Sequence, residues 1–347
     1  MRAAVVGSAG YAGGELLRLL SGHPNVDVVQ VTSERLSGKR VDLTHPPLRG
    51  RTDLRFTARE NLETVDVLFV ALEHGESSRH IDYLRGRAAL VIDLGADFRL
   101  RDARAYPTWY GWPHPRPALL KGAVYGLAEL HRDCMRDVTL IATGGCLATA
   151  SILALEPLAR AGVIDRAMPL VIEAKTGSSA GGAQPGAASH HPHRSGEMRS
   201  YAPTGHRHTA EIMQELHIDG DGPIVALSAT AVEAVRGVLA TAHVFLNDDL
   251  SEKDVRQIYR ACYADEPFVR IVKGSAGLHR SPNPKLLAGT NFCDIGFERD
   301  AHSRRLVVTS AIDNLVKGAA GQAVQALNVR CGWDETTGLG FTGLYPL

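Results

Sequence analysis

Apolar residues in the first 145 or so positions come in short runs that alternate with turn-forming and helical stretches. Five of these runs predict strands, at residues 3–6, 26–31, 65–72, 89–94 and 138–142. Helices are expected at residues 15–20, where leucines recur, and at 77–87. Strands that alternate with helices predict a parallel sheet with right-handed crossovers, so we expect an α/β fold.

The pattern changes after about residue 150, where the apolar runs become longer. They predict strands at 170–174, 224–231, 237–246 and 306–312, with one clear helix at 251–264 that has Ser251 as its N-cap. Residues 177–205, rich in Gly, Ser, His and Pro, are expected to be loop, and a last helix is expected at 317–329. We therefore predict two domains, one from residues 1–148 and 316–347 and an α+β one from 149–315.

Composition excludes several classes of protein. Lys and Arg number 38 and balance 38 Asp and Glu, so no charge excess points to nucleic acid. Five scattered cysteines argue against a disulfide framework and fit the reducing cytoplasm. Residues 138–155 are uncharged and long enough to cross a bilayer, but Gly144 and Gly145 interrupt them. We expect a strand, a turn and a helix there, and no membrane span.

A glycine-rich turn follows the first predicted strand. Closely spaced glycines, then the N-terminal amides of a helix, are typical of a pyrophosphate site. The spacing is GxxGxxG rather than GxGxxG, so the alternative is a turn that only packs the helix on the sheet. We interpret the segment as a dinucleotide site whose contacts are Gly7, Ser8, Ala9, Gly10, Tyr11, Ala12 and Gly13.

The end of the second strand indicates which dinucleotide is bound. An NAD enzyme usually places an acid on the ribose about twenty residues beyond the glycines. Here Ser33 and Arg35 are suited to a 2′-phosphate, and they favour NADP(H). Glu34, between them, is the residue that would favour NAD unless it points away.

Cys146 is the candidate nucleophile. The strand at 138–142 delivers it, after two glycines, to the first turn of a helix, where the dipole favours a thiolate. The alternative is a small buried cysteine, which is how we interpret Cys134, Cys262, Cys293 and Cys331.

A cysteine nucleophile needs an acid–base partner, and His206 and His208 are the candidates. In an extended segment their rings would point to opposite sides, so only one would face Cys146. A metal site is the competing interpretation of the nearby histidines His190, His191, His193, His206 and His208. No spacing matches a known site, and neighbouring arginines would repel a cation, so we expect none.

Two further turns carry polar residues at the ends of predicted strands. Asn314 can meet the cofactor or cap the helix that follows. Arg99 can bind an anionic substrate, although a lone arginine is more often a salt-bridge partner. Ser178 is a further candidate substrate contact.

At these residues the chain resembles the N-acetyl-gamma-glutamyl-phosphate reductase family from end to end. The resemblance rests on Gly-Tyr-Ala-Gly-Gly-Glu at 10–15, Asp-Leu-Gly-Ala-Asp-Phe-Arg at 93–99, Gly-Cys at 145–146, Gly-His-Arg-His-Thr-Ala-Glu at 205–211 and Asp-Asn-Leu-Val-Lys-Gly at 313–318. Residues 189–209 look like the branch that reduces carrier-protein-bound 2-aminoadipate 6-phosphate in bacterial lysine biosynthesis. One departure is Thr143-Gly144, where the family commonly has Asn-Pro or Ala.

The resemblance implies a semialdehyde-dehydrogenase-like fold, with a Rossmann-like dinucleotide-binding domain and an α+β substrate and dimerisation domain. It also implies NADP(H), a homo-oligomer (dimer or tetramer), and NADPH-dependent reduction of an acyl phosphate to a semialdehyde through a thioester on Cys146. The substrate would arrive on an acidic amino-group carrier protein, and the basic loop that holds Arg194 and Arg199 is suited to steer it. Alternatively, that loop only orders the active site or a subunit contact.

Three other functions are compatible with these residues. An arginine-pathway reductase would use the same chemistry on a free N-acetylated substrate. A cysteine acyl-transferase or thioesterase would use Cys146 and His208 without hydride transfer, which leaves the glycine turn without a purpose. A non-catalytic NADP-binding sensor would not need the glycine-flanked cysteine.

Overall fold

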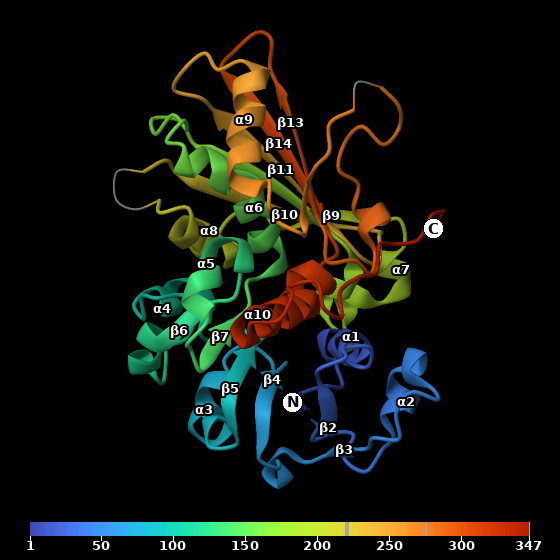
Figure 1. Cartoon of the computed structure of the whole chain (residues 1–347). Coiled ribbons are helices and arrows are strands. Elements are labelled where there is room, and N and C mark those ends of the chain that lie inside the picture. The colour runs from blue at the N-terminus through green and yellow to red at the C-terminus, as the bar shows by residue number, and fades with distance from the viewer. Residues whose placement is uncertain (219–221, 275, 347) are drawn as a thin grey trace. The chain divides into compact units, whose positions relative to one another are not determined.

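The chain folds into two compact units in the computed structural model, which describes residues 1–218, 222–274 and 276–346 (Figure 1). The first unit comprises Met1–Gly144, Gly182–Gln184 and Ala319–Gly340, and the second comprises Gly145–Gly181, Pro185–Gly318 and Phe341–Leu347. Residues 219–221, 275 and 347 fall within the predicted domains but outside the described residues. The predicted assignment of cofactor binding to one domain and catalysis to the other stays a prediction.

A seven-stranded parallel sheet forms the centre of the first unit, in the order β3-β2-β1-β4-β5-β7-β6. Its central strands are continuous apolar runs, as in β1, where Ala3, Ala4, Val5 and Val6 are fully buried. Such runs are typical of parallel strands that are covered on both faces. The strands are β1 (Arg2–Val6), β2 (Asp27–Thr32), β3 (Phe56–Thr57), β4 (Val65–Val70), β5 (Ala88–Asp93), β6 (Ala123–Tyr125) and β7 (Leu140–Ala142).

Helices connect and cover these strands. The last of them, α10, packs against α1 and α5 within the first unit (Figure 1). The helices of this unit are α1 (Tyr11–Leu20), α2 (Val41–Thr44), α3 (Ser77–Arg85), α4 (Ala105–Tyr110), α5 (Ala128–Met135) and α10 (Gly321–Cys331). A π-helical turn, Val316–Ala320, precedes α10.

The second unit is built on a mixed seven-stranded sheet, in the order β12-β13-β14-β11-β8-β10-β9. Buried and partly exposed residues alternate along β8, β10 and β11, so one face of the sheet carries most of the apolar side chains. The strands are β8 (Leu170–Thr176), β9 (Met198–Ala202), β10 (Val225–Val232), β11 (Val238–Phe245), β12 (Val269–Ile271), β13 (Cys293–Arg299) and β14 (Arg305–Ile312).

Helix α6 (Cys146–Arg160) packs on β11 and β14, with α8 (His208–Glu215) on β10 and α9 (Glu252–Tyr263) on β12. Two tyrosines of α9 tie it to α6, because Tyr259 and Tyr263 donate hydrogen bonds to the carbonyls of Ala154 and Leu153. Ser251 caps α9 as expected, and its hydroxyl accepts a hydrogen bond from the amide of Asp254. A short helix, α7 (His191–Arg194), completes the unit.

The predicted α/β fold is confirmed, but two expectations about the second half were wrong. Residues 177–205 are not simply loop, because they contain α7 and the edge strand β9. The helix at 251–264 is also not the only clear one there, since α8 follows at His208. Strand β9 was missed because its side chains are mostly exposed and polar, and pairing with β10 rather than an apolar run makes it a strand.

Candidate functional site

The glycine turn between β1 and α1 leaves room where a dinucleotide phosphate would bind. Gly7 has a φ of +76°, and a Cβ at Gly13 would lie 2.5 Å from the Cα of Ser8, so both positions require glycine. A Cβ at Gly10 would meet no described atom within 4 Å, and no side chain of the described residues caps α1 there. The first amides of α1 are therefore available to an anion, and the turn fits a pyrophosphate.

Two other residues of this region already have partners. The amide and the hydroxyl of Ser8 both donate to the carbonyl of Thr32, at 3.0 and 3.2 Å, so they hold β1 against β2. Glu34, after β2, accepts a hydrogen bond from the amide of Arg59 over 3.0 Å. Its carboxylate is thus turned to the backbone of that segment. Arg35 is exposed and makes no ion pair with any described residue, and Ser33, two positions earlier, is buried.

Cys146 lies at the first position of α6, directly after the N-cap Gly145. The backbone of Gly318 packs closely against the side chain of Cys146, because a Cβ at Gly318 would lie 2.6 Å from the Cβ of Cys146. Burial, and then the nearby negative charge of Cys146, raise the pKa of Tyr201 on β9 to about 12. At the N-terminus of a 15-residue helix, Cys146 is positioned to act as a thiolate.

His208 lies against the backbone next to Cys146, since a Cβ at Gly145 would collide with its Nε2 atom. The expectation that the two histidine rings point to opposite sides was wrong. Their centroids are 4.6 Å apart and the rings meet edge to face, because the segment turns into α8 instead of staying extended. The Nδ1 atom of His206 accepts a hydrogen bond from the amide of His208, and burial and then Arg207 lower the pKa of His206 to about 4.

Glu211 is a residue of this site that the sequence did not single out. It lies one turn into α8, is fully buried, and its Oε2 accepts a hydrogen bond from the amide of Gly145 over 2.9 Å. Glu211 belongs to the same sequence motif as His206 and His208, and this could have indicated a place in the site. Its contact with α6, however, results from the fold and cannot be inferred from the sequence.

Asn314 and Ser178 lie in a cluster of loops within the second unit. The Oδ1 atom of Asn314 accepts a hydrogen bond from the amide of Gly237, and its Nδ2 donates to Ser179. The amide of Ser178 donates to the carbonyl of Ala234. A cavity of about 500 Å³ adjoins these loops and is lined by Ala234, Val235, Arg236, Asn283, Pro284, Lys285 and Ala288. The sequence did not single out Arg236 or Lys285.

Arg99 is buried in the first unit and donates hydrogen bonds to the carbonyls of Thr143 and Leu94, at 2.7 and 3.0 Å. It therefore ties the loop after β5 to the end of β7. Its role as a substrate contact stays a prediction. At the end of β5, directly before this loop, the carboxyl of Asp93 is fully buried, and burial and then the charge of Asp97 raise its pKa to about 7.

Arg194 and Arg199, the predicted substrate contacts of the basic loop, share one acidic partner. Both pair with Glu197, and Arg194 also donates to the carbonyl of Val232. The side chain of Arg194 is only 12% exposed, whereas that of Arg199 is 47% exposed. Arg194 is thus largely committed to the structure of the loop, and Arg199 is the more accessible of the two.

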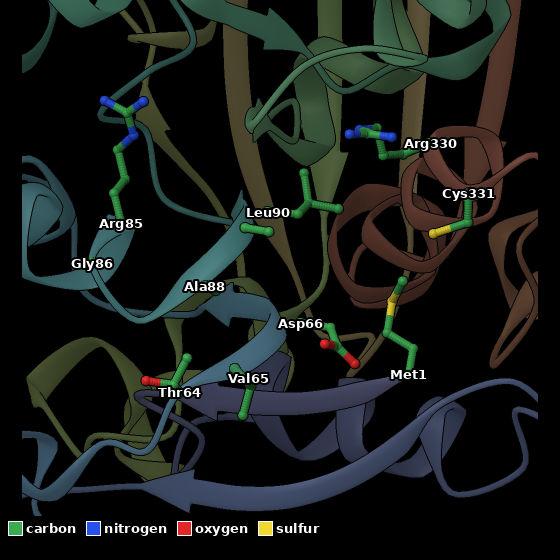
Figure 2. Close-up of a pocket in the computed structure, with 11 residues that line it drawn as sticks. Met1, Thr64, Val65, Asp66, Arg85, Gly86, Ala88, Leu90, Arg330 and Cys331 are labelled. Atoms are coloured by element: carbon green, nitrogen blue, oxygen red, sulfur yellow. The ribbon is translucent and has the colours of Figure 1, made fainter.

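A cavity of about 540 Å³ lies at the amino ends of β4 and β5, as Figure 2 shows. Ligands of doubly wound sheets bind at the carboxyl ends of the strands, where the glycine turn is. This cavity is therefore separate from the candidate cofactor site. Its lining is Met1, Thr64, Val65, Asp66, Arg85, Gly86, Ala88, Ala89, Leu90, Arg330 and Cys331.

Two further features of the described residues concern metals and membranes. No group of three or more His, Cys, Asp or Glu side chains there is placed to hold a metal ion. None of the helices in residues 1–218, 222–274 and 276–346 combines the length and apolar character needed to cross a bilayer.

Two family models match the chain. The NAD-binding domain of semialdehyde dehydrogenases matches residues 2–138, and the dimerisation domain of semialdehyde dehydrogenases matches residues 146–314. A nicotinamide cofactor is thereby supported for the first unit. Cys146 begins the second match.

Curated relatives are similar over their whole length. A protein of Thermomicrobium roseum, named as a putative [LysW]-L-2-aminoadipate 6-phosphate reductase, is 57% identical, with 99% of each chain covered. A Deinococcus radiodurans protein, named as a [LysW]-L-2-aminoadipate 6-phosphate reductase, is 50% identical and covers 99% of this chain and 97% of its own. A Haloarcula marismortui protein, named as a putative [LysW]-L-2-aminoadipate/[LysW]-L-glutamate phosphate reductase, is 51% identical, with 99% and 98% covered.

Solved structures agree on the fold. Aspartate semialdehyde dehydrogenase II from Vibrio cholerae superposes with a TM-score of 0.72 at 15% identity, over 95% of this chain and 98% of its own. The enzyme from Candida albicans superposes with a TM-score of 0.70 at 14% identity, over 94% and 97%. At such identities the likeness establishes the architecture alone.

Proposed function

The chain belongs to the [LysW]-L-2-aminoadipate 6-phosphate reductase family, and on this basis we propose that it reduces carrier-protein-bound 2-aminoadipate 6-phosphate to its semialdehyde in lysine biosynthesis. The reductant is NADPH and the intermediate is a thioester on Cys146. One observation carries the chemistry: Cys146 begins α6 while His208 lies against the backbone of Gly145, the residue before it.

The reaction can be followed through the chain's own residues. The thiolate of Cys146 attacks the carbonyl carbon of the acyl phosphate, and the bond between this carbon and the phosphate oxygen breaks. Phosphate departs, and a thioester on Cys146 remains. The glycine turn and the first amides of α1 would hold NADPH, which would supply the hydride that reduces the thioester. His208 gives a proton to the resulting oxygen and takes it back as the carbon–sulfur bond breaks, which releases the semialdehyde and restores the thiolate.

His208 is assigned the proton transfer because His206 is engaged elsewhere. The Nδ1 of His206 is occupied by the amide of His208, and a pKa near 4 keeps its ring neutral at ordinary pH. A neutral ring that also holds a helix start cannot supply a proton readily. His206 is therefore proposed to order the first turn of α8.

The choice of NADP over NAD rests on the end of β2. Glu34, the acid that would otherwise bind a ribose hydroxyl, accepts a hydrogen bond from the amide of Arg59. Arg35 is exposed and forms no ion pair with another described residue, so its guanidinium is available to a 2′-phosphate. Asn314, whose side chain is held by Gly237 and Ser179, stays a proposed contact of the cofactor.

The partner is proposed to be an amino-group carrier protein, since the names of the relatives imply a carrier-bound substrate for them, and the surface of this carrier is proposed to be acidic. Exposed basic residues on α7 and β9 support a docking surface, with Arg199 as its accessible arginine. The match to a dimerisation domain supports a homo-oligomer, and the biosynthetic role supports a cytoplasmic location.

A second substrate is favoured by the relative from Haloarcula marismortui, which is named for both aminoadipate and glutamate derivatives. Carrier-bound glutamyl phosphate is one methylene shorter, and a single methylene is worth only about 1–3 kcal/mol of discrimination in a pocket. We therefore include it as a second candidate substrate. Free N-acetylglutamyl phosphate is the alternative of the arginine pathway.

NADPH oxidation tests the proposal, with carrier-bound 2-aminoadipate 6-phosphate, carrier-bound glutamyl phosphate and free N-acetylglutamyl phosphate as substrates. The carrier-bound aminoadipate derivative is expected to be reduced with the highest kcat/KM. Cys262→Ala, at a half-buried cysteine of α9, serves as the matched control for Cys146→Ala. Preferential turnover of the free substrate would contradict the proposed pathway, and turnover by Cys146→Ala would contradict the thioester.

A further inference from the structure

The carboxylate of Glu211 reaches two parts of the catalytic site at once. Its Oε2 accepts the 2.9 Å hydrogen bond from the amide of Gly145, the N-cap of α6. Its Oε1 lies 3.9 Å from the Nε2 of His208, one turn earlier on α8. A single buried side chain thus joins the helix that carries the nucleophile to the imidazole that is proposed to move the proton.

Burial makes this arrangement informative. Glu211 has no exposed surface, and a buried carboxylate is costly unless hydrogen bonds and opposite charge compensate for the lost water. The Gly145 amide supplies one hydrogen bond, and the start of α6 supplies the positive end of a helix dipole. His208 would supply the opposite charge whenever its ring is protonated, since its Nε2 lies 3.9 Å from Oε1 of Glu211.

The contact with Gly145 also depends on the absence of a side chain there. A Cβ at Gly145 would collide with the ring of His208, so glycine allows the first turn of α8 to approach α6 closely. The carboxylate then fixes this approach by its bond to the same residue. Backbone and carboxylate together define where the imidazole lies relative to the start of α6.

We propose that Glu211 is a positioning residue that orients His208 and stabilises its protonated form during the reaction. This inference rests on the proposed function, since it assigns a role around Cys146 and His208. Glu211 acts through the imidazole and need not touch the substrate. Among the titratable and charged groups of this region, Glu211 and His206 lie near the imidazole. Arg207 directly precedes His208 in the chain, Cys146 follows the Gly145 that the ring meets, and Tyr201 on β9 lies near both His206 and Cys146.

The test is the pH profile of kcat/KM for Glu211→Gln. Glutamine can still accept the hydrogen bond from Gly145 through its oxygen, but it carries no charge. Its amide group would face Nε2, so the protonated imidazole loses its counter-charge. The alkaline limb, where His208 loses its proton, should therefore move to lower pH by about one to three units.

Glu215→Gln is the matched control, because Glu215 is also buried and lies one turn further along α8, where it accepts a hydrogen bond from Gln214. Its profile should superimpose on that of the wild type. Glu211→Asp keeps the charge but is one methylene shorter, so kcat should fall while the alkaline limb moves less than in Glu211→Gln. Circular dichroism and NADPH binding establish that each variant is folded.

The outcomes separate this inference from the proposed function. An alkaline limb in Glu211→Gln that matches the wild type overturns the role of Glu211. Equal displacement in Glu211→Gln and Glu211→Asp also overturns it, because the charge would then not be the cause. Should Glu211→Gln fail to fold, a Glu211→Asp variant whose alkaline limb moves by less than about one pH unit supports the role, and one whose limb moves by more than that overturns it. By contrast, wild-type protein that reduces none of the acyl phosphates contradicts the proposed function itself.

Discussion

The amide of His208 donates a hydrogen bond to the Nδ1 atom of His206 over 3.2 Å, and this bond gives the two neighbouring histidines different surroundings. The bond occupies one nitrogen of His206 and ties its ring to the start of α8. The ring of His208 is left against Gly145, beside Cys146 in the chain. The two positions should therefore respond differently to substitution.

His208→Gln should lower kcat by about 10²–10⁴-fold, because proton transfer to the thiohemiacetal oxygen is lost. His206→Asn should retain most of the turnover, since Asn can also accept a hydrogen bond at a helix start. NADPH oxidation under saturating substrate measures both. A larger fall in kcat in His206→Asn than in His208→Gln would assign the proton transfer to His206 instead of His208.

The neutral state of His206 should make the folded protein sensitive to acid. Its pKa is lowered from 6.5 to about 4, so the unfolded chain binds a proton more readily than the folded one. The corresponding stability is present above pH 6.5 and is lost as the pH falls toward 4, by at most about 3 kcal/mol. Denaturant unfolding of the wild type and His206→Asn should show a shallower decline for the variant across this range. Parallel declines would show that His206 is not the group responsible.

Arg35→Ala should weaken the binding of NADPH but not that of NADH. A charge-assisted bond to the 2′-phosphate is worth about 1.5–3 kcal/mol, so the KM for NADPH should rise at least about tenfold, while that for NADH stays nearly unchanged. Arg51→Ala, at another exposed arginine of the first unit, is the matched control and should change neither value. Equal weakening toward both cofactors would contradict the proposed contact.

Salt should slow the reaction on the carrier-bound substrate. Electrostatic steering is screened over about 8–10 Å at physiological ionic strength, so kcat/KM should fall steeply as salt rises from low concentration. Arg199→Ala should lower kcat/KM for the carrier-bound substrate more than for a carrier-free analogue. Arg256→Ala, an exposed arginine of α9, should not discriminate between them. Salt-independent rates would argue that the basic loop only orders the site.

Arg194 requires a different expectation, because its side chain is largely buried against Glu197 and Val232. Arg194→Ala should lower the free energy of unfolding or loosen the loop. It should therefore lower kcat/KM for the carrier-bound substrate and for the carrier-free analogue to the same extent. The sequence suggested the same role for both arginines, since it contains only their charge and not their burial.

Much of the fold was predictable because its strands are long and apolar. β1 and β4 are buried on both faces, and β11 alternates between buried and partly exposed positions. The short strands β3, β6 and β12 have two or three residues each, too few for a pattern, and they exist because a neighbour pairs with them. α8 was missed because the His206 ring, and not a Ser, Thr, Asp or Asn at the N-cap, meets its first amide.

Part of the local structure at the candidate site was also predictable, whereas the roles of its residues stay predictions. A cysteine after a strand and two glycines indicated a nucleophile at a helix start, and α6 does begin at Cys146. Glu211 could not be found, because its bond to Gly145 joins residues 66 positions apart. Similarly, Arg99 is buried and donates hydrogen bonds to the carbonyls of Leu94 and Thr143 because β5 and β7 pair with each other, which the sequence does not show.

The most direct test of the account is to mix the protein with carrier-bound 2-aminoadipate 6-phosphate in the absence of NADPH. Attack by Cys146 should release phosphate and join the carrier to the protein through a thioester, visible as a covalent adduct by intact mass spectrometry. NADPH should then discharge the adduct and release the carrier-bound semialdehyde, and Cys146→Ala should form none while Cys262→Ala behaves as the wild type. An adduct on another residue, or reduction by Cys146→Ala at the wild-type rate, would contradict the account.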